Sequence, residues 1–120
     1  MQSVSKIIAD IAAGRDTPAG AIARSRAAIG ERDNEIHAFE ALAPEGTGTA
    51  SEGPLAGIAV GVKDIFDTYD MPTRYGSPIY DGFRPRADAL ALAASSRSFF
   101  SRSSNLANAA TSALLCTGLH

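Results

Sequence analysis

Lys63 is the residue of this sequence whose type and position most directly allow chemistry. It ends the apolar run Leu55–Val62, which follows Gly53-Pro54 and therefore indicates a buried strand. An unpaired ammonium group is costly to bury, and burial lowers the pKa of a lysine. A neutral lysine can accept a proton, so we interpret Lys63 as a candidate general base.

The two faces of this strand differ in the size of their side chains. Alternation places Ala59 and Gly61 on the same face as Lys63, where small residues leave open volume for a substrate or a partner side chain. The opposite face carries branched residues suited to packing under helices: Ile58, Val60 and Val62. The sequence therefore predicts an accessible space above Lys63.

A second interpretation of Lys63 involves no catalysis. Asp64 and Asp67 follow it closely, and spacing alone favours an ion pair with one of these carboxylates at the strand end.

Two other residue types invite a catalytic reading, but neither pattern supports one. We expect His37 to be a solvated strand residue, and Ser77 to be a turn serine because it lacks the second glycine of a nucleophile elbow.

Two helices are predicted at the start of the chain. The first covers Val4–Ala13, with Ser3 or Ser5 as its N-cap. The second covers Pro18 to about Arg32 and begins with a proline behind the N-cap Thr17. These helices supply apolar faces that a neighbouring strand can use for packing.

The rest of the chain alternates between short regular elements and turns. A short strand is predicted over Ile36–Phe39, and a loop over Pro44–Pro54 separates it from the Lys63 strand. Glycine and proline pairs predict irregular structure over Asp67–Arg86. A further helix is predicted over Ala89–Ala94.

The composition excludes several classes of function. With 120 residues, 45% hydrophobic and 20% charged, the chain is one ordinary globular domain or a piece of a larger one. A net charge of −2 gives no reason to expect nucleic acid or membrane as a partner, and no run is long enough to span a bilayer. The sequence has no metal-ligand cluster and no phosphate-binding loop, so we expect no cofactor. A cytoplasmic protein is the default expectation.

The composition changes abruptly after Asp88. All 13 acidic residues lie at or before this position, and only two charged residues lie beyond it. Serine supplies six of the ten residues from Ser95 to Ser104. We therefore expect residues 1–88 to be the N-terminal part of a domain, and residues 89–120 to form a divergent, acid-free Ser/Ala/Leu-rich tail that is helical or disordered.

Four consecutive segments of this chain closely resemble the amidase signature family. The first segment carries Lys63, and the others follow it in the order that the family shows. The segments are Pro54–Asp64 (PLAGIAVGVKD), Asp67–Thr73 (DTYDMPT), Tyr75–Tyr80 (YGSPIY) and Gly82–Ala89 (GFRPRADA). The predicted helices and the first strand are also similar to the opening of that family, so the resemblance covers about residues 1–89.

The resemblance implies a fold and a chemistry. The fold is α/β, as the N-terminal fragment of the amidase signature fold, in which helices pack on a mixed β-sheet. The chemistry is hydrolysis of the carbon–nitrogen bond of a small-molecule amide by a Ser–cis-Ser–Lys triad. Lys63 matches the triad lysine, which deprotonates the middle serine so that this serine relays a proton from the nucleophilic serine. Backbone N–H groups stabilise the oxyanion in that family.

Both serines of that triad are missing from the pattern. The family carries them in a Gly/Ser-rich stretch of the GGSSGG kind, whereas the serines after Ala89 lack those glycines. We therefore expect a truncated and inactive chain that is marginally stable alone, with a tail like an out-of-frame continuation. The alternative is a non-catalytic protein-interaction module that docks through apolar tail residues: Phe99, Phe100, Leu106, Leu114 and Leu115.

Overall fold

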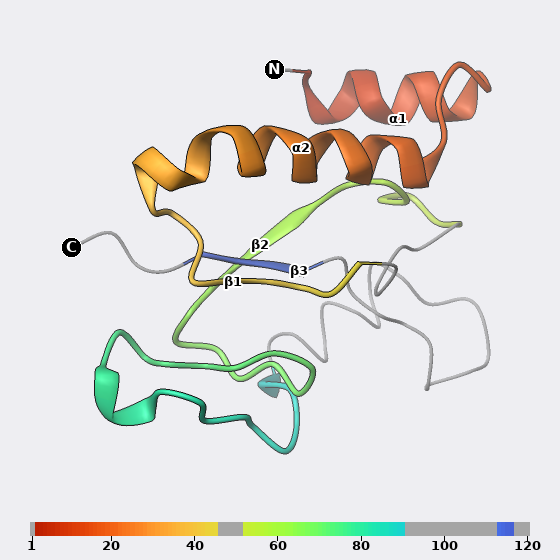
Figure 1. Cartoon of the computed structure of the whole chain (residues 1–120). Helices are drawn as coiled ribbons and strands as arrows, with labels where there is room; N and C mark the ends of the chain where they lie inside the picture. The colour runs from red at the N-terminus through yellow and green to blue at the C-terminus, as the bar shows by residue number, and fades with distance from the viewer. Residues whose placement is uncertain (1, 46–51, 91–112, 117–120) are drawn as a thin grey trace.

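A computed structural model describes residues 2–45, 52–90 and 113–116 of the chain. Helices α1 (Val4–Ala12) and α2 (Pro18–Ile36) lie on the same side of a small sheet (Figure 1). The predicted helix starts are confirmed. The Ser3 hydroxyl accepts the Lys6 N–H at 3.3 Å, and the Thr17 hydroxyl accepts the Gly20 N–H at 3.0 Å. Local capping groups therefore set both starts.

Helix α2 runs four residues beyond the predicted end at Arg32. The predicted strand Ile36–Phe39 is wrong, because Ile36 is the last helical residue and His37 ends the helix in the left-handed region at φ 52°. The Asp33 carboxylate accepts the next two backbone N–H groups, at 2.7 and 3.3 Å. This side chain satisfies donors that a strand ladder would otherwise use. His37 is exposed, as expected.

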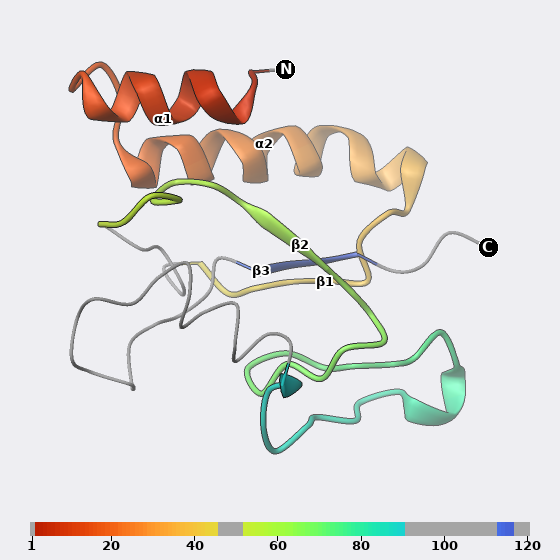
Figure 2. The ribbon, with the colours of Figure 1, turned by 180° about the vertical axis from the view of Figure 1, so that it is seen from behind.

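The sheet has three strands in the order β1-β3-β2 (Figure 2). Strand β1 is Ala41–Leu42, β2 is Val60–Lys63 and β3 is Ala113–Cys116. Strand β3 lies between the others, parallel to β2 and antiparallel to β1. The sheet is therefore mixed, with a strand from the far end of the chain at its centre.

The expectation of a helical or disordered tail is wrong for β3. Leu114 and Leu115, proposed above as docking residues, belong to this strand and are in register with both neighbouring strands. The strand forms because β1 and β2 present unpaired backbone groups, and this long-range context outweighs a helix-tolerant local composition. The other tail residues of that alternative, and most of the predicted helix 89–94, lie outside the described residues.

Strand β2 is shorter than the predicted run. The residues before it form turns, and Gly57 has φ 79°, in the left-handed region. A Cβ atom on Gly57 would lie 2.8 Å from both the Ile11 Cδ1 and the Pro18 Cα atoms. Glycine is needed there because the chain passes so close to the connection between the helices, and this turn delays the start of the strand.

The apolar core of the described residues is small. Ala43, Val62 and Met71 are buried together, and Ala41 packs against them. Residues 67–86 contain no regular element besides the short 3₁₀ helix η1 (Pro78–Tyr80), so the prediction of irregular structure is confirmed. Because apolar burial is limited, polar contacts must do much of the positioning near Lys63.

Candidate functional site

Lys63 is the last residue of β2, and its side chain is exposed. The expectation of a buried lysine is wrong. Val62 and Asp64 on either side are 4% and 2% exposed, and alternation along the strand therefore turns Lys63 outward. Gly61, also exposed, lies on the same face, in agreement with the predicted assignment of small residues to the lysine face.

The ion-pair interpretation of Lys63 is also wrong within the described part of the chain. None of the ion pairs found there includes Lys63. The Asp64 carboxylate accepts backbone N–H groups, and the Asp67 carboxylate accepts the Tyr75 hydroxyl. The Lys63 side chain is therefore exposed, and the two carboxylates that follow it in the sequence are engaged elsewhere.

Asp64 fixes the chain on the far side of the lysine. Its Oδ1 atom accepts the Arg74 N–H at 2.8 Å, and its Oδ2 atom lies 3.5 Å from the Gly76 N–H. The Lys63 carbonyl accepts N–H groups from Ile65 and Phe66, at 2.8 and 3.0 Å. A tight turn thus follows the end of β2 at once, and the Asp64 side chain links this turn to a second turn at residues 74–76.

Asp67 makes a second link across the same loop. It accepts the Tyr75 hydroxyl, and this hydrogen bond, with desolvation and the nearby negative charge, raises the pKa of Tyr75 to about 12. The Asp67 carbonyl accepts the Ala89 N–H at 2.8 Å, and the Asp88 carboxylate accepts the Tyr69 N–H at 2.9 Å. Both ends of the loop are therefore held beside β2.

Arg74 connects this loop to the other edge of the sheet. Its guanidinium forms an ion pair with Glu40, the residue before β1, and lies 3.6 Å from Asp81. The aromatic ring next to it, Tyr75, meets Tyr80 edge-on with the ring centres 5.0 Å apart. The local sequence points to Lys63 but not to the roles of Asp64 and Arg74, because Asp64 binds a turn ten residues away and Arg74 pairs with Glu40, still farther along the chain.

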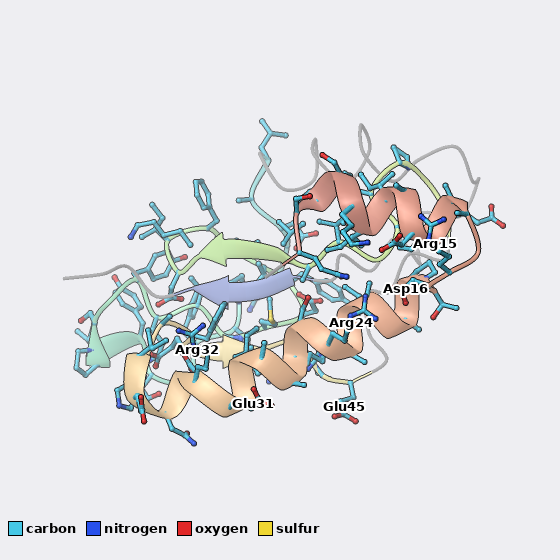
Figure 3. All side chains as sticks on the ribbon, turned by 90° about the horizontal axis from the view of Figure 1, so that it is seen from above. Arg15, Asp16, Arg24, Glu31, Arg32 and Glu45 are labelled. Carbon is cyan, nitrogen blue, oxygen red and sulfur yellow. The ribbon has the colours of Figure 1, made fainter. Side chains whose placement is uncertain are left out.

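Separate ion pairs tie each helix to the connection between them. Asp10 accepts Lys6 at 2.8 Å and Arg15 at 2.8 Å, which lowers the pKa of its carboxyl group. Figure 3 shows Arg24 of α2 beside Asp16 of the connection, and this ion pair lowers the pKa of Asp16. These contacts are structural, because each charge is matched by a partner within the same helical pair.

Two other kinds of site find no support in the described residues. No group of three or more His, Cys, Asp and Glu residues there can hold a metal ion. No helix in the same residues is long and apolar enough to cross a membrane. Ser77, for its part, accepts the Ile79 N–H at 3.4 Å at the start of η1, which is the structural role expected of a turn serine.

Comparison with known proteins relates this arrangement to one family. The family model described as Amidase matches residues 31–94. One subunit of glutamyl-tRNA(Gln) amidotransferase from Rhodopirellula baltica is 36% identical over 105 residues, which cover 78% of this chain and 21% of that protein. The corresponding protein from Thermobifida fusca is 36% identical over 99 residues, covering 72% of this chain and 20% of that protein.

A solved structure is similar over nearly the whole chain. It is described as an inhibitor-bound "unexpected vestigial protein complex" that "reveals the evolutionary origins of an s-triazine catabolic enzyme". The similarity has a TM-score of 0.71 and 28% sequence identity, and it covers 98% of this chain and 26% of that one. This chain therefore spans about a fifth of the length of the curated relatives and about a quarter of the solved one.

Proposed function

This chain belongs to the amidase signature family, and we propose that it is the part of an amidase that carries the catalytic lysine. The reaction is hydrolysis of the carbon–nitrogen bond of a small-molecule amide in the cytoplasm. Lys63 supports this proposal most directly. It lies within the family match, and the two carboxylates that follow it accept other donors, so neither holds its side chain in an ion pair.

In this proposal Lys63 is the general base of a Ser–cis-Ser–Lys triad. It removes a proton from the middle serine, which in turn takes the proton of the nucleophilic serine as that oxygen attacks the amide carbon. The return of this proton to the departing nitrogen completes cleavage. Water then releases the acyl group by the same relay.

The two serines come from a Gly/Ser-rich stretch that this sequence does not contain. Catalysis therefore requires polypeptide beyond these 120 residues. The relatives are about five times as long as the matched segment, so they have ample chain to carry the serines. On its own, this chain supplies a base without a nucleophile and is inactive.

Co-expression tests this proposal. The chain is produced together with the part of the Rhodopirellula baltica relative that lies outside the matched segment, and the two are purified through a tag on this chain. We expect a complex that releases amine from a panel of simple aryl and primary amides. Lys63→Ala abolishes this release, whereas Lys6→Ala, which changes the only other lysine, does not. Failure to form a complex, or release that survives Lys63→Ala, contradicts the proposal.

A further inference from the structure

The geometry points to Asp64 as a positioning residue for Lys63. The Asp64 carboxylate holds the lysine-bearing end of β2 against the turn at residues 74–76. This inference rests on the proposed role of Lys63 as a base, and it adds a residue that does not touch the reacting atoms. Three observations carry it: the burial of Asp64, its two backbone partners, and the unusual conformation of the turn that it holds.

Burial of Asp64 determines where Lys63 points. Asp64 is 2% exposed, and a carboxylate is rarely buried this completely without donors that compensate for lost water. Val62, two residues earlier, is 4% exposed. With inward-facing residues on both sides, the backbone of Lys63 has little freedom to rotate its side chain toward the interior.

The donors to Asp64 are backbone groups from one distant turn. The Arg74 N–H lies 2.8 Å from Oδ1, and the Gly76 N–H lies 3.5 Å from Oδ2. Backbone donors are fixed by the path of the chain, so they restrain the carboxylate more tightly than flexible side chains do. One buried side chain thus ties the residue after Lys63 to a segment ten to twelve residues away.

The turn has a conformation that it does not adopt without support. Tyr75 has φ 51° and Gly76 has φ 68°, and the left-handed region is unfavourable for a residue such as tyrosine. The Tyr75 hydroxyl donates to Asp67, and its ring packs edge-on against Tyr80. These contacts hold the turn from the outside while Asp64 binds it from the inside, which is the pattern expected where a functional site needs a fixed backbone.

Three variants test this role: Asp64→Ala, Asp64→Asn and Asp81→Asn. Alanine removes both acceptors, whereas asparagine keeps an oxygen for Arg74. Asp81 is the matched control, because its side chain also approaches Arg74 but is 75% exposed. Hydrogen exchange of the full chain is measured first. We expect Asp64→Ala to speed exchange of the Arg74 and Gly76 amides by about tenfold, and Asp64→Asn to speed only that of Gly76.

The position of Lys63 is read directly by NMR. Only two lysines are present, so ¹³C-methylated chain gives resolved signals for Lys63 and Lys6. Asp64→Ala should shift or broaden the Lys63 signal and leave the Lys6 signal unchanged. Asp64→Asn and Asp81→Asn should leave both close to wild type. An unchanged Lys63 signal in Asp64→Ala overturns the inference, and so does an equal change in Asp81→Asn.

Kinetics of the co-expressed complex separate positioning from general stability. A displaced base lowers kcat while substrate binding is kept, so we expect Asp64→Ala to lower kcat about tenfold or more with KM within about twofold. Asp64→Asn should recover most of kcat. A change in KM alone overturns the inference. If the wild-type complex is inactive, the proposed function fails, and the Lys63 signal still decides the role of Asp64. If Asp64→Ala does not fold, the selective change at Gly76 in Asp64→Asn decides it.

Discussion

The Asp64 carboxylate accepts the backbone N–H of Arg74 at 2.8 Å, across ten residues of sequence. Arg74 in turn forms an ion pair with Glu40, immediately before β1. A short polar path therefore runs from the lysine end of β2 to the start of β1 at the other edge of the sheet. This path matters because the buried apolar cluster beside these strands, within the described residues, contains only three side chains: Ala43, Val62 and Met71.

Arg74→Ala tests the outer half of this path. The substitution removes the guanidinium from Glu40 and Asp81 but leaves the backbone N–H that Asp64 accepts. We expect the free energy of unfolding to fall by about 1 kcal/mol, since the pair with Glu40 is only partly exposed. Urea denaturation measures the change. Arg84→Ala is the control, because Arg84 makes one contact with a backbone carbonyl on an exposed loop, and a loss equal to that of Arg74→Ala would contradict the account.

Tyr75 provides a test at high pH. Its hydrogen bond to Asp67 raises the pKa of Tyr75 from 10.0 to about 12. A raised pKa means that the hydrogen bond stabilises the fold fully below pH 10 and that this contribution is lost as the pH rises toward 12. Absorbance of tyrosinate should show a transition near 12 that Asp67→Asn moves back toward 10. Tyr69→Phe, a change at an exposed tyrosine, should leave that transition in place.

Low pH tests the contribution of the Asp10 ion pairs to the stability of the two helices. Hydrogen bonds from Lys6 and Arg15 lower the pKa of Asp10 below its ordinary value of 3.8. A lowered pKa means that the stabilisation is complete above pH 3.8 and is lost as the pH falls through the lower, folded-state value. Helical circular dichroism should therefore decline in acid, and Asp10→Asn should weaken this dependence. Glu52→Gln, at an exposed position, should leave the decline unchanged.

Two glycines with opposite surroundings test the packing of the turn before β2 against the helices. An alanine Cβ at Gly57 would lie 2.8 Å from the Pro18 Cα atom, on a backbone at φ 79°. We expect Gly57→Ala to lower the free energy of unfolding by about 1–3 kcal/mol. Gly30 in α2 has no atom within 4 Å of such a Cβ, and Gly30→Ala should stabilise the chain by about 0.5–1 kcal/mol. Thermal melts that rank the two variants in the reverse order would refute this packing.

Sequence was a good guide wherever one local interaction sets the structure. Both helix starts could be predicted because a cap bonds to the next turn: Thr17 was the single candidate for α2, and Ser3 is the one of two candidate serines that caps α1. The end of α2 was missed because it depends on the Asp33 side chain and a left-handed His37. No local pattern marks Leu114 as part of a strand, since its partners lie more than fifty residues earlier.

The candidate site could likewise be predicted only in part. Its lysine could be found from the apolar run and from the family resemblance, because both are properties of neighbouring residues. The exposure of Lys63 could not be predicted, because nothing in the local sequence indicates that Asp64 faces inward and turns Lys63 outward. A carboxylate that binds a turn ten residues away has no signature in the residues around it.

The release of amine by the co-expressed complex is the decisive measurement of whether Lys63 is the general base. We expect Lys63→Ala to lower kcat by about a thousandfold or more, because the base that activates the nucleophile is removed, and Lys6→Ala to stay within about twofold of wild type. Both variants should co-purify with the serine-bearing partner as wild type does. A Lys63→Ala complex that turns over at the wild-type rate would contradict the assignment of Lys63 as the base.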